Sequence, residues 1–365
     1  MPANGAGYIT ARDNLVIDFD RDALVERVCE FNQSRLDDAA VLEAYDVAVK
    51  KGWDVRRARA ELKLVDIPKR VIQTNYRPLD SRWIFFDSTL VWGRSWPTMR
   101  HVVGDGRNLT MLATRMTKDK WDVWVARTVS SHKALSAYDT NSVFPLYLTG
   151  DAESPQSSVA SERQCNFSAV FLKSLAGALG RPQEGPCMLP SGLSPEDVFH
   201  YAYAVFESPG YRKRYAEFLK SEFPRLPLPG SLDVFRSLAG LGGELAALHL
   251  LESPTLAKPM TEFIGDRNPE VDKISWSRDT VWVDKRQTTG FRGVPEPVWK
   301  FHIGGYQVCE KWLKDRKGRT LSDDDIAHYQ KIVVALSETI RLMTEIDRVI
   351  DAHGGWPGAF QPAPG

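Results

Sequence analysis

Two stretches of the sequence are rich in lysine and arginine, side chains whose chemistry is the neutralisation of phosphate groups. Residues 68–133 contain 12 Lys or Arg against 5 Asp and no Glu, and residues 284–319 contain 9 basic residues against 4 acidic ones. Proteins use such an excess of positive charge to bind the nucleic-acid backbone. The two stretches could therefore line one groove if the fold brings them together, the alternative being two solvated faces without a ligand.

The rest of the chain limits this interpretation. Lys and Arg together number 47, and so do Asp and Glu, which gives a formal net charge of zero. A protein that binds nucleic acid over its whole surface normally carries a basic excess. Residues 13–66 are acidic, with 13 Asp or Glu against 9 Lys or Arg. A nucleic-acid site would therefore be local.

The seven histidines form no metal-binding pair spaced by four residues. His200 and His249 fall within apolar helical patterns, which favours satisfied core histidines over catalytic ones. His101 and His132 lie in the first basic stretch, where an imidazole can donate to a base edge or a phosphate. Ordinary surface histidines are the alternative there.

The four cysteines are far apart in the sequence, and no C-x-x-C motif is present. This spacing favours neither a zinc site nor a disulfide framework. We therefore expect four isolated small hydrophobic side chains, at Cys29, Cys165, Cys187 and Cys309.

Sequence motifs for catalysis are absent. An adenine methyltransferase needs a glycine-rich turn and an Asn/Asp/Ser-Pro-Pro-Tyr/Phe loop, but Gly104–Gly106 is too short and Phe144–Tyr147 has a single proline. Neither a phosphate-binding loop of ATPases nor a G-x-S-x-G nucleophile motif occurs. Pro269–Lys273 has the carboxylates and lysine of some nucleases but no further acidic partner. We expect no catalysis and no cofactor in this chain, leaving open an enzyme with an unfamiliar site.

Composition places the chain among folded globular proteins. Of the 365 residues, 43% are hydrophobic and 26% charged, which predicts an ample core, and two subdomains are the default at this length. No apolar run approaches the roughly 18 residues of a membrane span, and no secretion signal is evident at the N-terminus. We expect a cytoplasmic protein that does not associate with membranes.

Hydrophobic periodicity predicts an α+β fold. Residues 21–64 have the pattern of two or three helices, and short β-type runs follow at 71–74, 83–86, 109–112 and 121–125. Residues 149–165 read as a flexible connection. Helices are predicted at 167–179, from a Ser194 cap, at 211–223, at 232–251 and from Ser322, with a basic strand pair near 281–291. The predicted divisions are 1–66, a helical linker or coupler; 67–150, a mixed β-sheet target-recognition subdomain; and 166–356, a mainly helical subdomain with a small β insertion.

Several segments in this order resemble the C-terminal specificity region of type ISP restriction-modification enzymes, which join nuclease, helicase-like ATPase, N6-adenine methyltransferase and target-recognition domains in one chain. Gly7–Asp13 is similar to the family's G-x-x-T-x-R-D segment, and Tyr76–Arg82 to its Y-R-P-F-D-x-R, with Leu79 in place of Phe. The resemblance is strongest at Asp197–Leu228. It continues in the same order at Phe144–Leu148, Gly304–Tyr306, Lys311–Arg316 and Leu321–Ile326.

The resemblance implies a sequence-specific DNA-recognition module without catalytic motifs of its own. The nuclease, ATPase and methyltransferase parts would lie upstream of Met1, so the chain would be a fragment, a split-gene subunit or a remnant. Its partners would be double-stranded DNA and the methyltransferase or helicase domains or subunits of the same system. Methyl donor and ATP would bind in those parts, and the duplex would be held here while an adenine is flipped there.

Phosphate contacts would set the register on DNA, and a few loop side chains would reach base edges in the major groove. For Arg77 and Arg82 a buried ion pair with Asp80 is a strong alternative, and Tyr211, Arg212, Arg225 and Trp312 read as mainly architectural. The candidate DNA contacts are Arg82, Arg94, Arg100, His101, Arg115, Lys118, Lys120, His132, Lys285, Arg286 and Arg292.

A protein-interaction scaffold is the competing interpretation. In it, a tryptophan-rich surface would dock a separate methyltransferase or helicase subunit. DNA affinity would fall steeply with salt, whereas apolar docking would be nearly indifferent to it. The tryptophans of that surface would be Trp83, Trp92, Trp96, Trp121 and Trp124.

Overall fold

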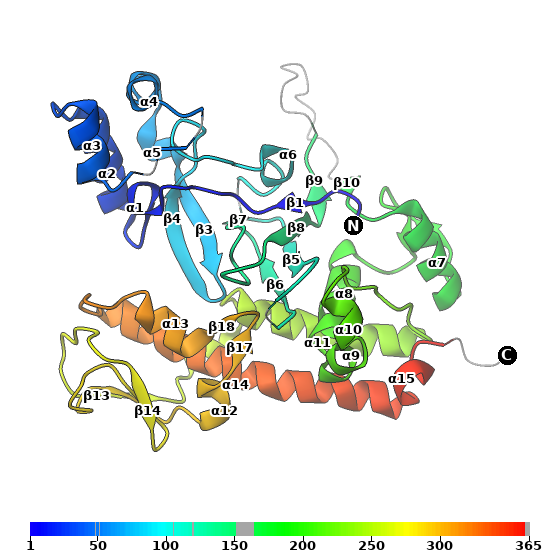
Figure 1. Ribbon diagram of the computed structural model, residues 1–365. Coiled ribbons are helices and arrows are strands. Elements are labelled where there is room, and N and C mark those ends of the chain that lie inside the picture. The colour runs from blue at the N-terminus through cyan, green and yellow to red at the C-terminus, as the bar shows by residue number, and fades with distance from the viewer. Residues whose placement is uncertain (48, 51, 105, 119, 151–163, 362–365) are drawn as a thin grey trace.

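The computed structural model describes residues 1–47, 49–50, 52–104, 106–118, 120–150 and 164–361. Helices of the N-terminal region lie at the upper left of Figure 1, strands pass through the centre, and the long helix α14 (Asp323–Ala352) runs along the lower side. The α+β fold class predicted from the sequence is confirmed.

An aspartate caps the start of each of the predicted N-terminal helices. Asp20, Asp37 and Asp54 each accept a hydrogen bond from a backbone N–H in the first turn. Among the described residues, three helices lie within residues 21–64, and the second of them ends at Ala44, shortly before Asp46 with φ 47°. The helices of this region are α1 (Asp13–Val16), α2 (Arg21–Gln33), α3 (Asp38–Ala44), α4 (Val55–Leu62) and α5 (Ile67–Arg70).

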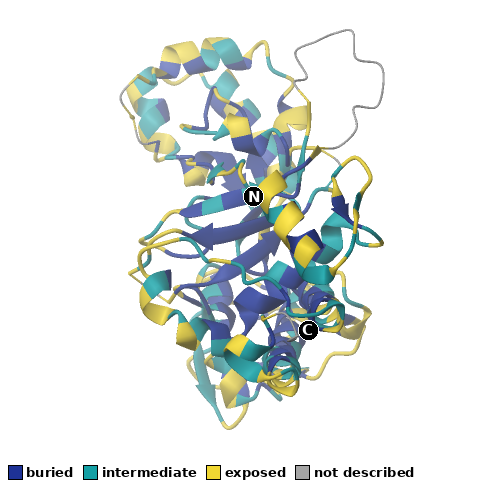
Figure 2. Ribbon diagram, turned by 90° about the vertical axis from the view of Figure 1, so that its right-hand side faces the viewer, coloured by how far each residue is buried: buried dark blue, intermediate teal, exposed yellow. Residues whose placement is uncertain are grey.

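The predicted β-type runs become strands of two sheets. One sheet has the order β2-β4-β3-β7 and the other β1-β8-β5-β6. Figure 2 shows these strands as a buried layer through the middle of the molecule. β1 and β2 come from the first predicted segment and pair with strands of the second, so these segments share both sheets. The strands are β1 (Gly5–Ala6), β2 (Ile17–Asp18), β3 (Val71–Arg77), β4 (Asp80–Phe85), β5 (Thr110–Thr114), β6 (Val123–Ala126), β7 (Val129–Ser130) and β8 (Asn141–Pro145).

Capping residues read from the sequence begin the helices of the C-terminal half. Ser194 and Ser322 each form a capping box with the Asp three residues later. The single helix predicted at 211–223 is wrong: Ser208 and Pro209 start it early, and the backbone at Tyr215 leaves the helical conformation. The helices are α7 (Ala169–Leu179), α8 (Pro195–Glu207), α9 (Pro209–Arg214), α10 (Ala216–Leu219) and α11 (Leu232–His249).

The predicted basic strand pair is part of a larger sheet, ordered β13-β16-β15-β14. It packs on α14 through Phe291, whose ring centroid lies 4.3 Å from that of Tyr329. The remaining elements are α6 (Trp96–Met99), β9 (Tyr147–Leu148), β10 (Gln164–Cys165), β11 (Gln183–Glu184), β12 (Leu189–Pro190), η1 (Pro254–Ala257), β13 (Glu262–Ile264), β14 (Ser275–Ser277), β15 (Thr280–Trp282), β16 (Gly290–Arg292), α12 (Glu296–Trp299), β17 (His302–Ile303), β18 (Tyr306–Gln307), α13 (Val308–Lys314) and α15 (Gly355–Gly358).

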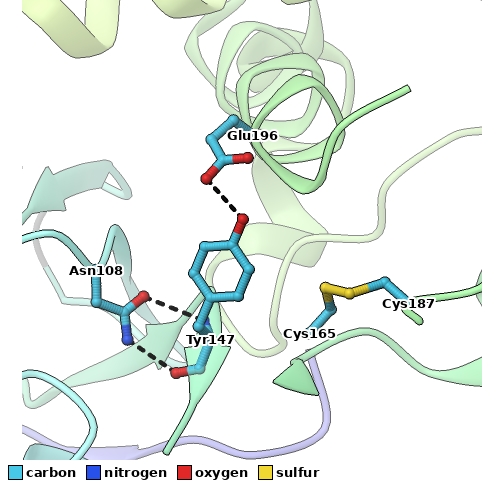
Figure 3. The surroundings of a disulfide bond; sticks show 5 residues. All are labelled: Asn108, Tyr147, Cys165, Cys187 and Glu196. Carbon is cyan, nitrogen blue, oxygen red and sulfur yellow. Dashed lines mark hydrogen bonds between the residues drawn. A yellow bond between two sulfur atoms is a disulfide. The ribbon is translucent and has the colours of Figure 1, made fainter. Parts of the chain in front are cut away.

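The prediction that all four cysteines are isolated is wrong. Cys165 and Cys187 form a disulfide, with their Cα atoms 5.6 Å apart, close to the hydrogen bond from Tyr147 to Glu196 (Figure 3). The loop that follows α7 doubles back through β11 and β12, and this close approach leaves no spacing signature in the sequence. Most of the flexible connection predicted at 149–165 lies outside the described residues.

The packing of α8 on α11 requires a glycine. A Cβ atom on Gly242 would lie 1.9 Å from the carbonyl oxygen of His200, whereas a Cβ on the exposed Gly240 would meet nothing within 4 Å. We expect Gly242→Ala to lower the free energy of unfolding by about 2 kcal/mol through backbone displacement. Gly240→Ala should raise it by about 0.5 kcal/mol through helix propensity. Chemical denaturation of both variants tests this, and equal effects would contradict it.

In the part of the chain that the structure describes, no helix combines the length and the apolar character that a membrane crossing requires.

Candidate nucleic-acid interface

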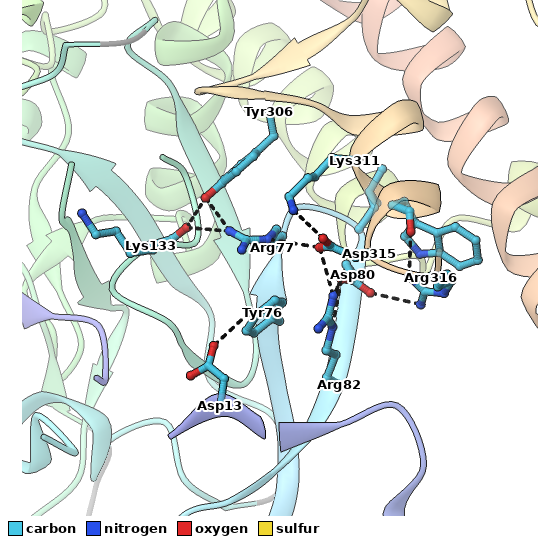
Figure 4. A network of polar contacts seen from close by, with 12 residues as sticks. Asp13, Tyr76, Arg77, Asp80, Arg82, Lys133, Tyr306, Lys311, Asp315 and Arg316 are labelled. Atoms are coloured by element: carbon cyan, nitrogen blue, oxygen red, sulfur yellow. Dashed lines mark hydrogen bonds and ion pairs between the residues drawn. The ribbon is translucent and has the colours of Figure 1, made fainter. Parts of the chain in front are cut away.

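A cluster of arginines and aspartates, here called the arginine junction, joins the β3–β4 hairpin to α13 (Figure 4). Nη2 of Arg82 lies 2.7 Å from Oδ2 of Asp80 and 3.1 Å from Oδ2 of Asp315. Arg77 donates to Asp315 over 3.4 Å, and Arg316 donates to Asp80 over 3.1 Å. Residues more than 230 positions apart are thereby held together, so the two basic stretches lie against each other, as the groove hypothesis required.

The junction is largely buried. The side chains of Asp80 and Arg316 are 3% and 6% exposed. Burial alone would raise the pKa of Asp80, but the charges of Arg82 and Arg316 outweigh it and lower that pKa. The guanidinium of Arg316 also stacks on Trp312 at 3.4 Å. Arg82 and Arg316 therefore act as internal counterions of Asp80.

A second buried polar cluster, the buried triad of Asp122, Glu207 and Arg212, joins β6 to α8 and α9. Arg212 donates from Nη2 to Asp122 over 2.5 Å and to Glu207 over 2.6 Å. Asp122 also accepts from the backbone N–H of Gly304 over 2.9 Å. Burial raises the pKa of Glu207 to about 8, which makes it the protonated member at neutral pH. The architectural reading of Arg212 agrees with these contacts.

His249 is the core histidine that its helical pattern indicated. The hydroxyl of Thr339 donates to Ala335, so it accepts from Nε2–H of His249, over 2.9 Å. Nδ1 therefore accepts from the hydroxyl of Tyr203, over 2.6 Å. Burial, followed by the charge of Arg212, lowers the pKa of His249 to about 3, so the ring is neutral.

Both basic stretches contribute to one cavity of about 540 Å³, here called the basic cavity. Lys120 comes from the first stretch, Lys300 and His302 come from the second, and Lys220 follows α10. Trp121, Phe301, Leu219, Pro297 and Met343 supply apolar wall, and the paired side chains Asp122 and Arg212 also line it.

The lysines at the basic cavity are accessible. Lys300 and Lys220 are 67% and 60% exposed, and each forms an ion pair with an exposed glutamate on its own helix or turn. Such exposed pairs contribute little to stability, so a phosphate group can displace the carboxylate at low cost. The arrangement suits contacts to an anionic polymer.

Beside the junction lies a smaller recess of about 190 Å³, here called the motif pocket. Tyr76 donates to Oδ2 of Asp13 over 3.0 Å, and Thr10 also donates to Asp13. Burial, followed by Asp13, raises the pKa of Tyr76 to about 12, so its hydroxyl remains a donor at neutral pH. The recess is lined by Thr10, Asp13, Tyr76, Arg77, Ser131, His132, Lys133, Ala137 and Tyr306.

Three of the candidate DNA contacts are engaged inside the protein. Arg82 belongs to the arginine junction, with 11% of its side chain exposed. His101, expected in an exposed loop, is buried, and its Nδ1 accepts from the backbone N–H of Thr149 over 3.0 Å. His132 is half-buried and donates from Nδ1 to the carbonyl of Tyr8 over 3.0 Å. For Arg82 the geometry favours the ion-pair alternative, and the DNA role of all three stays a prediction.

The other candidates do not share one surface. Arg94 and Arg100 flank α6, whereas Lys285, Arg286 and Arg292 lie on or beside the β13–β16 sheet, well separated from α6 in Figure 1. Lys285 is paired with Asp272 and Arg292 with Glu262. Of the remaining candidates, Lys120 lines the basic cavity, while Arg115 and Lys118 are exposed on the loop that precedes it.

Sequence reasoning missed Lys220, Lys300 and His302. The loop before β6 packs on the turn after α10, with the N–H of Thr117 donating to the carbonyl of Lys220 over 3.2 Å. The signal available in the sequence was the basic run Arg212–Arg214, which opens the segment that ends at Lys220.

Comparisons with known proteins identify a family with a similar sequence and solved structures with a similar fold. The sequence matches the Type ISP C-terminal specificity domain over residues 1–345. No match is found among curated proteins.

Three solved structures share the fold. A nuclease-deletion mutant of the Type ISP restriction-modification enzyme LlaGI, in complex with a DNA substrate mimic, has 17% identity and a TM-score of 0.64, covering 94% of this chain and 27% of that one. A cryoEM structure of a DrdV–DNA complex has 20% identity and a TM-score of 0.71, covering 94% and 35%. The ATP-dependent Type ISP restriction-modification enzyme LlaBIII bound to DNA has 17% identity and a TM-score of 0.68, covering 94% and 23%. The chain therefore spans between 23% and 35% of the length of these proteins.

Proposed function

Because the chain belongs to the Type ISP C-terminal specificity domain family, we propose that it is the DNA-recognition module of a restriction-modification system. The module binds duplex DNA and selects its sequence, while adenine methylation, ATP hydrolysis and cleavage take place in other parts of the system. Its partners are double-stranded DNA and those methyltransferase and helicase parts, in the cytoplasm. The family match over residues 1–345 is the observation that carries the proposal.

The basic cavity supports the proposal. Lys120 belongs to the first basic stretch and Lys300 to the second, and both line the cavity. Lys220, which follows α10, adds a third positive charge. Lysines that are exposed at the rim of a cavity can contact phosphates and set the register, without reading sequence themselves. Base reading is then a task for the exposed Arg115 and Lys118 and for Arg94 and Arg100.

The scaffold alternative is less well supported. Trp121 and Trp124 are 9% and 1% exposed, so they belong to the core and cannot dock a partner. Trp92 and Trp96 remain exposed, at 45% and 44%, but the guanidinium of Arg94 lies 4.7 Å above the Trp96 ring. An exposed Trp–Arg stack suits nucleic acid as well as protein.

The test is selection of duplexes from a randomised pool at near-physiological salt, followed by a salt titration on the selected sequence. We expect an enriched motif and an affinity that falls by about 0.9 log units per log unit of salt for each phosphate contacted. Retention that does not depend on salt would contradict DNA recognition. Retention without enrichment would mean that sequence selection requires the rest of the system.

The basic cavity makes a specific prediction. Lys120→Ala combined with Lys300→Ala should weaken duplex binding about tenfold and reduce the salt slope by about 2, since two phosphate contacts are lost. The matched control is Lys63→Ala, an exposed lysine at the end of α4, a helix that does not line the cavity and is well separated from α10 and α12 in Figure 1. Equal slopes for the double variant and the control would remove the cavity from the interface.

A further inference from the structure

The motif pocket gathers the polar residues of segments that are far apart in the chain. Thr10 and Asp13 come from the first segment of family resemblance, Tyr76 from the second, and Tyr306 follows the Gly304–Gly305 turn. Residues 10 and 306 are brought to one recess of about 190 Å³. This volume is below the roughly 300 Å³ at which pockets for drug-sized ligands begin, so the recess suits a small ligand.

The groups that face the recess are chiefly hydrogen-bond acceptors. Asp13 is exposed, and each of its oxygens retains a lone pair beyond the bonds from Thr10 and Tyr76. Burial lowers the pKa of His132, and its Nδ1–H donates to the carbonyl of Tyr8. Nε2 of His132 is therefore an acceptor, and none of the described residues is found to donate to it.

The basic groups at the pocket are already engaged. Arg77 lies between the rings of Tyr76 and Tyr306, at 4.7 and 4.6 Å, and donates to Asp315. Lys133 donates to the carbonyl of Tyr138. With Arg77 held between two rings and bonded to Asp315, the carboxylate of Asp13 and Nε2 of His132 remain as acceptors for a ligand that donates hydrogen bonds.

We propose that the motif pocket binds the amino-bearing edge of a single unpaired nucleobase, adenine or cytosine, with Asp13 and Nε2 of His132 accepting its N–H groups. This rests on the proposed function for the source of the base, a DNA strand held at the adjoining basic stretches. Proteins that bind a base outside the stack recognise it by hydrogen bonds to its Watson–Crick edge. Asp13 and His132 are then binding residues without a chemical step.

Two nucleosides that differ by one amino group test the pocket directly. Binding of 2′-deoxyadenosine and of purine 2′-deoxyriboside, which lacks the amino group, is measured by ligand-observed NMR. We expect deoxyadenosine to bind about tenfold more tightly, because a hydrogen bond to a carboxylate is lost in its analogue. Asp13→Asn should abolish the difference, since its amide keeps the bond from Tyr76 but places N–H donors at the mouth.

Asp46→Asn is the matched control, because Asp46 is an exposed carboxylate outside the recess and the charge change is the same. It should retain the full preference for deoxyadenosine. Equal binding of the two nucleosides, or a preference that survives Asp13→Asn, would overturn the proposal.

Duplexes with one bulged base, adenine or purine, are measured in parallel with a fully paired duplex. A preference for the bulged adenine is expected in the wild type and not in Asp13→Asn. Binding of the paired duplex without any base or nucleoside preference would reject the pocket and leave DNA recognition standing. Nucleoside preference without binding of any duplex would reject DNA recognition and retain the pocket.

Discussion

Replacing Asp80 with Asn is expected to lower the free energy of unfolding by roughly 3 to 5 kcal/mol, the usual cost of removing one partner of a buried ion pair. Asp80 is 3% exposed and pairs with Arg82 and Arg316, which are 11% and 6% exposed. The amide carries no charge, so the buried Arg316 would keep only the partly exposed Asp325, at 3.4 Å, as an acidic partner. The arginine junction would then hold the β3–β4 hairpin to α13 more weakly.

The pH dependence of this stability loss shows whether the charge of Asp80 is its cause. The charges of Arg82 and Arg316 lower the pKa of Asp80 below its unfolded value, so its contribution to stability is present above about pH 4 and is lost as pH falls through the folded pKa. The difference between wild type and Asp80→Asn should therefore narrow in acid. Denaturant unfolding at several pH values measures it.

Ser81→Ala is the control for this experiment. Ser81 is exposed on the same strand, and its replacement should change stability by no more than about 0.5 kcal/mol. A constant difference between wild type and Asp80→Asn from neutral to acid pH would show that the loss comes from packing rather than charge.

Replacing Arg212 with Met should lower the free energy of unfolding by about 3 kcal/mol, because the buried Asp122 would lose its ion-pair partner. Asp122 and Glu207 are 5% and 4% exposed, whereas a fifth of the Arg212 side chain reaches solvent, which places the effect at the lower end of the range for buried pairs. Arg214→Met, on the exposed side of the same helix, should change stability by less than about 0.5 kcal/mol. Thermal and denaturant unfolding compare the two variants.

Glu207 makes the stability of the protein depend on pH in the direction opposite to that expected from Asp80. Burial raises the pKa of Glu207 to about 8 in the folded state, above its value in the unfolded chain. At pH values between these two pKa values, the folded protein binds a proton that the unfolded chain has released. Stability falls as pH rises through this window and levels off above it. Glu207→Gln mimics the protonated form, so the variant should gain stability relative to wild type as pH rises to 8. A difference that does not vary with pH would contradict the raised pKa.

The local structure of this chain could be predicted because it depends on short-range physics. Ser194 followed by Pro195 and Asp197 carries its own capping partners, and α8 begins there. The run that became β3 contains the β-branched residues Val71, Ile72 and Thr74, which favour a strand. The family resemblance rested on segments such as Gly7–Asp13, which the comparison with the specificity domain family confirms.

Individual site residues were less predictable, because exposure and partners depend on distant chain segments. His101 lies among loop residues in the sequence, yet it is buried against Thr149. Cys165 and Cys187 are 22 residues apart with no motif, and only the doubling back of the chain makes them a disulfide. Basic runs in the sequence included Lys300 and led up to Lys220, but only the fold places these two lysines at one cavity with Lys120.

By itself, the sequence determined the family, the α+β class, the caps of the main helices and the presence of two basic stretches, all of which are encoded in residues close together along the chain. Only the tertiary structure decided which of those charges face inward. Asp315 and Asp80 neutralise the arginines of the β3–β4 hairpin because burying an unpaired charge costs too much free energy. The lysines left at the basic cavity are accessible because no such cost applies to a charge that remains in water.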